Sequence, residues 1–287
     1  VSNLPDPYSG TVPHVMDTKE VYRVAEAYIN TAKRLADCGF DGVELHGAHG
    51  YLITQFLSAA SNIRDDEFGG DTVSRTLFIR NIAQGIKEAC GKNFIVGLKM
   101  PADEGVEGGV DPNEAEQITG LLSATNNFDY FSYGQGNFSL SLENHVPDLY
   151  FREGHFIDLH KRMRAAANGV PVMALGRIGT AQLAEDVIEN GNGDLVGMSR
   201  ALITDAALPQ KAQLGDIKDI RPCVFDNFSW GEIHLGKPLT EHHNPYLGKK
   251  DEAFFRLKPA EFSKRVVVAG SGPAGLEAAW VAAARGH

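Results

Sequence analysis

Two histidines stand three residues apart in the stretch VELHGAHGY, where a short apolar run gives way to glycines. Alternate side chains of an extended strand share a face, so Glu44 and His46 would point the same way. The glycines on either side of His49 would let the chain turn and bring this ring back over the same edge. Two imidazole N–H groups placed there can hold a carbonyl or carboxylate oxygen on which negative charge develops. The alternative is that one ring packs in the core and hydrogen-bonds a backbone carbonyl.

Further polar side chains follow other apolar runs along the chain. Lys99 ends such a run, and a lysine at the end of a buried strand is rarely present for packing alone, although it can also extend to solvent. Small residues beside a guanidinium suit a phosphate group. An arginine in such a pair could instead form an ion pair with a carboxylate such as Asp194. The candidate phosphate-binding pairs are Gly176 with Arg177 and Ser199 with Arg200.

Helical patterns alternate with short runs rich in Val, Ile and Leu. In the first helix, Asp17 or Thr18 provides the cap, apolar residues recur at intervals of three and four, and Gly39 marks the end. Five helix–strand pairs in succession indicate a parallel sheet covered by helices. The predicted strands are 42–46, 94–100, 128–134, 170–176 and 194–199, and the helices before them are 18–38, 74–90, 112–125, 156–168 and 180–191.

Two arrangements of helix–strand pairs compete, an open doubly wound sheet and a closed eight-stranded barrel. An open sheet has its ligand site at one switch point, whereas a barrel brings the carboxyl end of every strand to one mouth. Because polar residues follow strand after strand, we expect an α/β fold of the (β/α)8 TIM-barrel type. Five strands cannot close it, so its N-terminal strands would lie upstream of Val1. The absence of an initiator methionine agrees with an incomplete chain.

The last residues carry a glycine motif, RVVVAGSGPAGLEAA, in which Gly270, Gly272 and Gly275 stand between an apolar run and an alanine-rich stretch. A sixth strand followed directly by a helix predicts a pyrophosphate site for FAD or NAD(P). The chain ends before the acidic ribose-binding residue expected about 20 positions further on. We therefore predict five βα units of a barrel in 1–204, a linker region in 205–262 and the start of a Rossmann-like dinucleotide-binding domain in 263–287.

Composition narrows the class of partner. The chain has 27 basic and 37 acidic residues, a formal net charge of -10, which argues against nucleic acid or an anionic membrane surface. No apolar run approaches the ~20 residues of a membrane span, and the 3 cysteines are too widely spaced for a disulfide framework. With no secretory signal, we expect a cytoplasmic protein with a small-molecule substrate. The oligomeric state is left open, a homo-oligomer included.

The stretch GFDGVELHGAHGYLITQFLSAASNIRDDEFGGDTVSR, followed by GLKM, MALGRI and DLVGMSRALITD, resembles the Old Yellow Enzyme family of FMN-dependent barrel oxidoreductases. The later LPQKAQLGDIKDIRPC, HNPYLG and the glycine motif are similar to its multidomain branch. That branch includes trimethylamine and dimethylamine dehydrogenases and the bacterial 2,4-dienoyl-CoA reductases. The resemblance runs from about Thr18 to the end of the chain. It implies an FMN enzyme whose barrel mouth binds a small organic substrate.

The resemblance also implies roles for the polar residues. His46 and His49 would hold the activating group of the substrate above the flavin, although the trimethylamine dehydrogenase branch has a tyrosine at the first position. Lys99 stands where the family has arginine. It supplies a positive charge beside the flavin pyrimidine edge, but not the planar fork of arginine. The two small-residue–arginine pairs fall where barrels commonly hold a phosphate and would bind that of FMN.

One departure from the family follows Cys223. Relatives with an iron–sulfur cluster have three further cysteines in this region, where this chain has Asp226, Ser229 and Glu241. One thiolate cannot hold a four-iron cluster, so we expect no 4Fe–4S cluster. The electron donor or acceptor stays open among nicotinamide, quinone, oxygen and a partner flavoprotein. A zinc site from Cys223 and the histidines after it fits no standard spacing, and we expect no metal.

Two reactions fit such a mouth. One is oxidation of an N-methylated amine or amino acid, with hydride leaving a methyl group and the iminium hydrolysing to formaldehyde. The other is NAD(P)H-dependent reduction of an enoyl or dienoyl substrate. Tyr133 and Trp230, with neighbouring aromatics, could surround an alkylammonium group, although core packing explains them equally well. A third possibility is a non-catalytic flavin-binding remnant, against which the retained histidines, Lys99 and phosphate residues argue.

Overall fold

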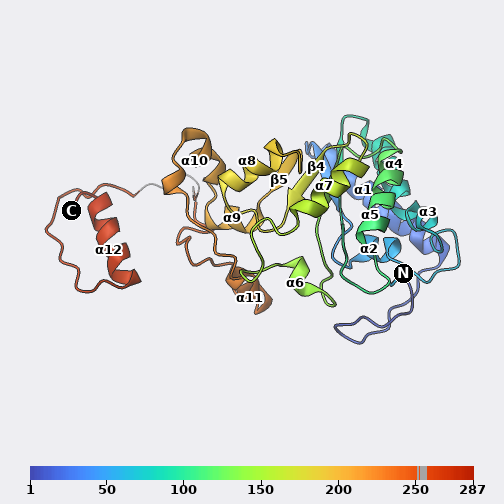
Figure 1. The fold of residues 1–287 in the computed structure, drawn as a ribbon, viewed down its shortest axis with the longest axis horizontal. Helices are drawn as coiled ribbons and strands as arrows, with labels where there is room; N and C mark the ends of the chain where they lie inside the picture. Colours follow the sequence, from blue (N-terminus) through green and yellow to red (C-terminus); the bar gives the residue numbers. More distant parts are fainter. Residues whose placement is uncertain (251, 253–256) are drawn as a thin grey trace.

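The computed structural model describes residues 1–250, 252 and 257–287. Helices and strands alternate through most of the chain, and a last helix lies apart from them (Figure 1). The strands are β1 (Gly42–His46), β2 (Ile95–Met100), β3 (Tyr130–Tyr133), β4 (Val172–Leu175) and β5 (Leu195–Gly197). The helices are α1 (Thr18–Asp37), α2 (Leu52–Leu57), α3 (Thr72–Arg75), α4 (Leu77–Cys90), α5 (Pro112–Ser123), α6 (Leu142–His145), α7 (Ile157–Ala166), α8 (Ala181–Glu189), α9 (Ser199–Thr204), α10 (Leu208–Leu214), η1 (Ile217–Asp219, a 3-10 helix), α11 (Phe228–His234) and α12 (Pro273–Ala284).

The five strands are parallel and hydrogen-bond in the order β1-β2-β3-β4-β5. Each strand is added at the same edge of the sheet, so right-handed crossovers place the intervening helices on one face. A doubly wound sheet would reverse its strand order at a switch point. The order within the described residues advances in one direction only. This confirms the predicted α/β fold, and the winding is that of a (β/α) barrel.

The predicted elements are present with small shifts of their ends. All five predicted strands form, each within two residues of its expected ends. The helix predicted at 74–90 is interrupted at Thr76, which separates α3 from α4. The short helices α2, α6, α9, α10 and α11 were not predicted, because runs of four to seven residues show too little periodicity to be recognised.

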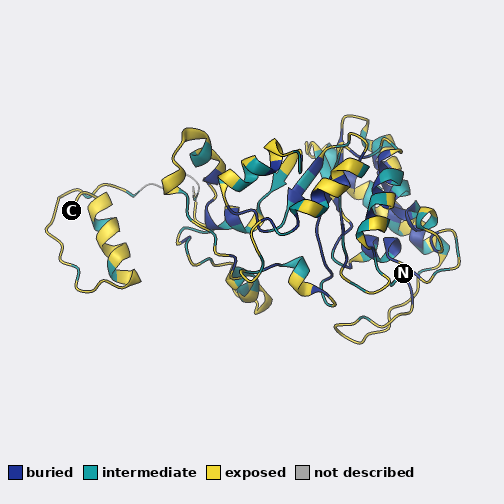
Figure 2. Cartoon of the chain, viewed as in Figure 1, coloured by how far each residue is buried: buried dark blue, intermediate teal, exposed yellow. Residues whose placement is uncertain are grey.

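The two faces of the sheet have different surroundings. Leu98, Phe131 and Val172 are fully buried against the covering helices, and Figure 2 shows buried residues concentrated where helices meet strands. The opposite face carries polar side chains, among them Glu44 and Lys99. Because alternate residues of a strand point to opposite faces, the apolar set anchors the sheet while the polar set remains free for a site.

The first helix begins as the sequence predicts. The carboxylate of Asp17 accepts from the backbone N–H of Glu20 at 2.8 Å, and the Glu20 carboxylate accepts from that of Asp17 at 3.0 Å. This capping box satisfies two donors that a helix start leaves unpaired. The end lies just before Gly39, whose φ of +87° suits glycine. Neither α1 nor any other helix of the described residues is long and apolar enough to cross a membrane.

The C-terminal segment differs from expectation. The sixth strand predicted at 265–270 is wrong for this structure, since among the described residues no other strand lies beside this run to pair with it. α12 does begin directly after the glycine motif, with Gly272 as its N-cap. A side chain at Gly275 would collide with the carbonyl of Gly270, so the motif adopts its tight turn. The Rossmann-like domain itself stays a prediction.

Candidate functional site

The two predicted histidines lie side by side at the end of β1. Their ring centroids are 5.2 Å apart. His49 has a φ of +64°, a conformation uncommon outside glycine. Its carbonyl accepts from the backbone N–H of Phe138 at 2.9 Å, which ties the turn to the loop after β3. Burial lowers the pKa of His49 to about 2, and burial, with Lys99 nearby, also lowers that of His46, so both rings favour the neutral form.

Lys99 of β2 lies directly beside His46 of β1 in the pairing of these two strands. Its Nζ lies 3.0 Å from Glu44 Oε1, and the other oxygen of that carboxylate accepts from Ser132 Oγ at 2.9 Å. The lysine is therefore ion-paired on the polar face of the sheet and does not simply extend to solvent. The positive charge of Lys99 is offset in part by Glu44. A ligand at this edge would meet an ion pair with neutral imidazoles beside it.

A cavity of about 610 Å³ opens at the carboxyl ends of the strands. Parallel strands present their C-terminal ends at one edge, so residues far apart in sequence meet there. His46 is not among the residues that line the cavity, but its ring lies next to that of His49. The cavity brings together seven of the predicted site residues: His49, Lys99, Gly176, Arg177, Ser199, Arg200 and Trp230.

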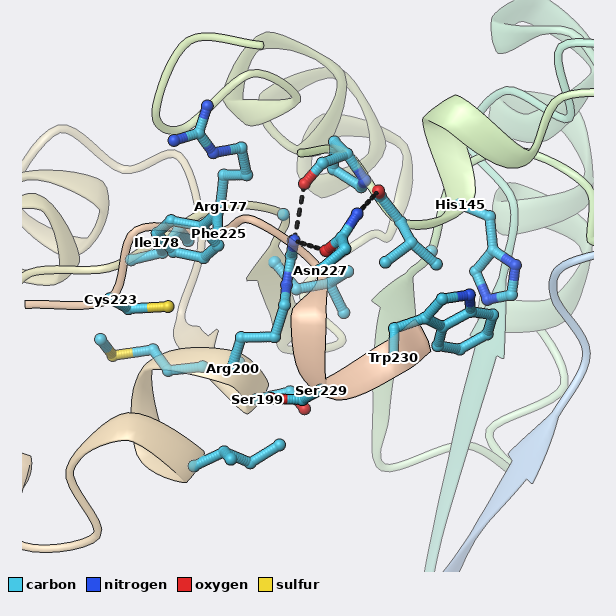
Figure 3. Close-up of a pocket in the computed structure, with 18 of the residues that line it drawn as sticks. His145, Arg177, Ile178, Ser199, Arg200, Cys223, Phe225, Asn227, Ser229 and Trp230 are labelled. Carbon is cyan, nitrogen blue, oxygen red and sulfur yellow. Dashed lines mark hydrogen bonds between the residues drawn. The ribbon is translucent and has the colours of Figure 1, made fainter. Parts of the chain in front are cut away.

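Two arginines lie against one aromatic ring in this cavity (Figure 3). The guanidinium carbons of Arg177 and Arg200 are 4.8 Å and 4.7 Å from the ring centroid of Phe225. Arg177 is only 8% exposed, and its Nε has no hydrogen-bond partner among the described residues. An unsatisfied buried donor is unfavourable, and contact with an aromatic face offsets only part of that penalty. An anionic group in this part of the cavity would therefore be stabilised.

Arg200 is also held by polar contacts, drawn as dashed lines in Figure 3. Its Nη1 donates to the carbonyl of Pro147 at 2.7 Å and to Asn227 Oδ1 at 2.6 Å. Asn227 in turn donates to the carbonyl of Val146 at 2.8 Å. These bonds join the start of α9 to the loop before α7 and to the residues before α11. The suggested alternative partner, Asp194, pairs elsewhere, with an arginine of α7 at 2.8 Å.

The aromatic residues divide between core and cavity. Tyr133 is fully buried, and its hydroxyl lies 2.8 Å from Thr119 Oγ1 of α5, on the side of the sheet away from the cavity. The structure thus overturns the prediction that Tyr133 binds substrate, because the strand alternation points this ring to the helices. Phe131 is buried in the same layer. Trp230 does line the cavity, from α11.

Cys223 and the residues that take the place of the expected cysteines all line the cavity: Asp226, Ser229 and Glu241. The part of the chain that the structure describes has no group of three or more His, Cys, Asp or Glu side chains placed to hold a metal ion. Two of the nearby histidines are engaged otherwise. His242 lies 3.1 Å from Asp226, and His243 Nδ1 lies 2.8 Å from the carbonyl of Pro222.

Among the cavity residues that were not predicted from the sequence are His145, Phe225 and Asn227. Phe225 and Asn227 both have positive φ values, +56° and +58°, and a sequence pattern reveals neither. His145 ends α6, a helix of four residues. The sequence gives little signal for them, because His145 ends a very short helix and the other two lie in a segment without regular secondary structure.

Fold and site together define a class, the barrel-type flavin-dependent oxidoreductases, in which a basic cavity and hydrogen-bond donors meet at the strand ends. Residues 4–219 match the NADH:flavin oxidoreductase / NADH oxidase family, and the chain belongs to this family. This match, together with relatives matched over nearly the whole chain, confirms the resemblance to the multidomain branch of the Old Yellow Enzyme family.

Individual relatives are similar to this chain over nearly all of its length. The chain is 34% identical over 288 residues to NADH oxidase of Thermoanaerobacter brockii, covering 100% of this chain and 44% of that protein. It is 33% identical over 277 residues to a probable N-methylproline demethylase of Rhizobium meliloti, covering 96% and 41%. The structure of a 2-naphthoyl-CoA reductase complex superposes with a TM-score of 0.91 at 28% identity, covering 100% and 43%. The chain thus spans less than half the length of these relatives.

Proposed function

We propose that this chain forms the FMN-binding part of an enzyme that transfers hydride between the flavin and a small substrate with a carboxylate or acyl oxygen. The principal reaction would be oxidative demethylation of an N-methylated amino acid. One observation carries the proposal: His49, Lys99, Arg177 and Arg200 line a single cavity, with His46 beside it. This is the set that a flavin and an activated substrate require together.

The cavity residues fit the phosphate and ring of FMN. Arg177 is buried and offers an Nε without a partner in the described chain, as a phosphate-binding group would before its ligand arrives. Arg200 is fixed beside it by Asn227. We assign Lys99 to the pyrimidine edge of the flavin, with Gly176 and Ser199 close to the phosphate. FMN supplies the hydride acceptor, while these residues bind and orient it.

The histidines would bind the substrate oxygen. With lowered pKa values they are uncharged at neutral pH and so present N–H donors. N-methylproline, named in one relative, carries a carboxylate, and 2-naphthoyl-CoA, named in another, carries a thioester carbonyl. Both groups accept hydrogen bonds from a pair of imidazoles. Trp230 would form an apolar wall of the same cavity.

A second candidate is the reduction of an alkene conjugated to a carbonyl. It is favoured by His46, which stands where the amine-dehydrogenase branch has tyrosine, and by the similarity to a reductase structure. Polarising the carbonyl through two N–H donors would prepare the double bond for hydride from the reduced flavin.

We also propose that electrons pass directly between FMN and a nicotinamide, without a four-iron cluster. Cys223 alone supplies a thiolate at the segment where relatives have four cysteines, while Asp226, Ser229 and Glu241 occupy the other positions. The family description, which names NADH, supports this partner. Assay of iron and acid-labile sulfide in the purified protein tests the proposal, and a value near four irons per chain would refute it.

The glycines at 270, 272 and 275 support a further site for FAD or NAD(P) in the complete domain. A cytoplasmic location stays a prediction of the sequence, and the oligomeric state stays open. Extraction of bound nucleotides from the purified protein, followed by chromatography, distinguishes FMN alone from FMN with an adenine nucleotide.

Visible spectra under anaerobic conditions separate the two reactions. If the protein is a demethylase, N-methylproline should bleach the flavin absorbance and formaldehyde should appear. If the protein is a reductase, NADH should bleach the flavin absorbance, and addition of cinnamate, a conjugated carboxylate, should restore it. A protein that binds FMN and responds to neither would support the non-catalytic alternative.

A further inference from the structure

A third imidazole, that of His145, lies face to face with the ring of His49. Their centroids are 3.7 Å apart and their planes differ by 23°. On the cavity side, Trp230 approaches His145 edge-on, at 5.7 Å and 77° (Figure 3). Nδ1 of His145 is buried and has no hydrogen-bond partner within the described residues. The ring is therefore held by stacking and not by a polar contact.

The loop that carries His145 is fixed independently of this stack. Asn137 donates through its backbone to Ser141 Oγ at 2.8 Å, and that hydroxyl donates to the carbonyl of Glu104 at 2.6 Å. The Asn137 side chain also donates to the buried Glu104 carboxylate at 3.2 Å. A side chain at Gly136 would collide with the backbone of the same loop. The loop is thus anchored to the chain after β2 and presents His145 from a rigid support.

The same loop also contacts the turn that holds His49. Phe138 donates its N–H to the carbonyl of His49 and stacks on Tyr51, with ring centroids 5.5 Å apart and planes within 7°. A backbone bridge joins His49 to Asn137. Because His49 adopts a left-handed backbone conformation, these contacts offset a local strain. His145 adds the contact that determines the plane of the ring.

We propose that His145 is a positioning residue for substrate binding, which fixes the ring of His49 by stacking on it. The inference rests on the proposed function, because it assigns a partner to a histidine expected to bind the substrate. The groups that face His49 are His145 from α6, His46 from β1 and Lys99 from β2. Burial, to which the stacked ring of His145 contributes, lowers the pKa of His49 most, and the charge of Lys99, or of either imidazole once protonated, lowers it further.

Three variants test the stack. His145→Ala removes the ring, His145→Phe keeps a ring without its nitrogens, and Glu143→Gln is the control. Glu143 lies two residues earlier on α6 and is exposed. In the purified protein labelled with 15N-histidine, the His49 signals, assigned by their loss in His49→Asn, should not titrate between pH 5 and 8. His145→Ala should bring a His49 transition into that range, whereas His145→Phe and Glu143→Gln should not. An unchanged His49 in His145→Ala overturns the proposal, as does a transition in His145→Phe.

Affinity gives a second readout. With N-methylproline as the probe, His145→Ala should raise KM about fivefold to tenfold, as expected for loss of one stacked ring pair. It should also make KM depend on pH below neutrality, while His145→Phe keeps a flat profile. Equal KM values and flat profiles in all three variants would refute the positioning role. If N-methylproline fails to bleach the flavin of the unaltered protein, the proposed function fails, but the titration of His49 still tests the stack.

Discussion

At the scale of single residues, the site sets neutral donors beside fixed charges. Burial holds the pKa of His49 at about 2, whereas lysine and arginine side chains are charged at neutral pH. Lys99 is balanced by Glu44, whereas Arg177 packs on the ring of Phe225 and its Nε has no hydrogen-bond partner among the described residues. An anionic phosphate therefore has most to gain near Arg177, and a substrate oxygen near the histidines. The division of roles follows from where charge is already compensated.

Replacement of His49 by alanine should weaken substrate binding. A hydrogen bond to a charged oxygen contributes ~1.5–3 kcal/mol, so KM for N-methylproline should rise about tenfold to a hundredfold. The rate of flavin reduction at varied substrate concentration measures this. His14→Ala is the matched control, since that ring is 79% exposed beside Glu20. The assignment fails if both substitutions change KM alike.

The buried histidines should also make stability depend on pH. The pKa of His49 is lowered to about 2 and that of His145 to about 4, mainly by burial. The pKa of each histidine is therefore lower in the folded protein than in the unfolded chain, where it is about 6.5. Between these two pKa values, unfolding is accompanied by uptake of a proton. Stability is therefore complete above pH 6.5 and declines as pH falls toward these folded values.

Denaturant titrations at pH 7, 6 and 5 measure the decline. We expect the free energy of unfolding to fall by about 1 kcal/mol per pH unit for His49 below pH 6, after allowance for its partial exposure. His49→Asn should remove that share of the slope. A slope that the substitution leaves intact would mean that His49 is not kept neutral by the fold.

At the scale of elements, the sequence predicts best where one periodic pattern repeats. The five strands and their preceding helices were identified because each buries an apolar face, and Asp17 because it completes a capping box. The short helices and the residues with positive φ, such as Phe225 and Asn227, were not. Their conformations depend on tertiary contacts, including the arginine–phenylalanine packing, and leave no periodic signal. Tyr133 is a different case, because the alternation of β3 places it with Phe131 on the helix-covered face, which favours the core-packing alternative.

The capping box predicts a stability effect without a functional one. Asp17→Ala removes the acceptor for the Glu20 N–H and should lower the free energy of unfolding by about 1 kcal/mol. Asp37→Ala, at the other end of α1, loses only an exposed ion pair with Lys33 and should change it by less than ~0.5 kcal/mol. Thermal unfolding of both variants gives the comparison. Equal effects would show that the cap is not formed in solution.

Asn227 connects the segment before α11 to the proposed FMN site. Its side chain links Arg200 to the carbonyl of Val146. Asn227→Ala should therefore loosen Arg200 and weaken FMN binding by about tenfold, the equivalent of one lost hydrogen bond to a charged group. Fluorescence titration of the apoprotein with FMN measures the change. Asn168→Ala, at a surface position that also has positive φ, is the control and should bind FMN normally.

At the scale of the whole molecule, the order of the strands determines which side chains lie together at the carboxyl ends of the strands. Since β1 to β5 advance in one direction, residues as far apart in sequence as Glu44 and Glu241 line one cavity. The chain spans 41% to 44% of the length of these two curated relatives. The activity of the whole protein is therefore a proposal that rests on this shared part. The glycine motif and α12 lie apart from the other elements (Figure 1), and within the described residues the motif forms its turn without a neighbouring strand.

One flavin is expected to bind in the cavity that Lys99, Arg177 and Arg200 line. Equilibrium binding of FMN to the apoprotein, followed by flavin fluorescence, tests it most directly. We predict that one FMN binds per chain and that Arg177→Gln lowers its affinity about tenfold to a hundredfold. Arg164→Gln should leave the affinity unchanged, because Arg164 pairs with Asp194 on the surface. Failure of the unaltered protein to bind FMN, or equal affinity in both variants, would contradict it.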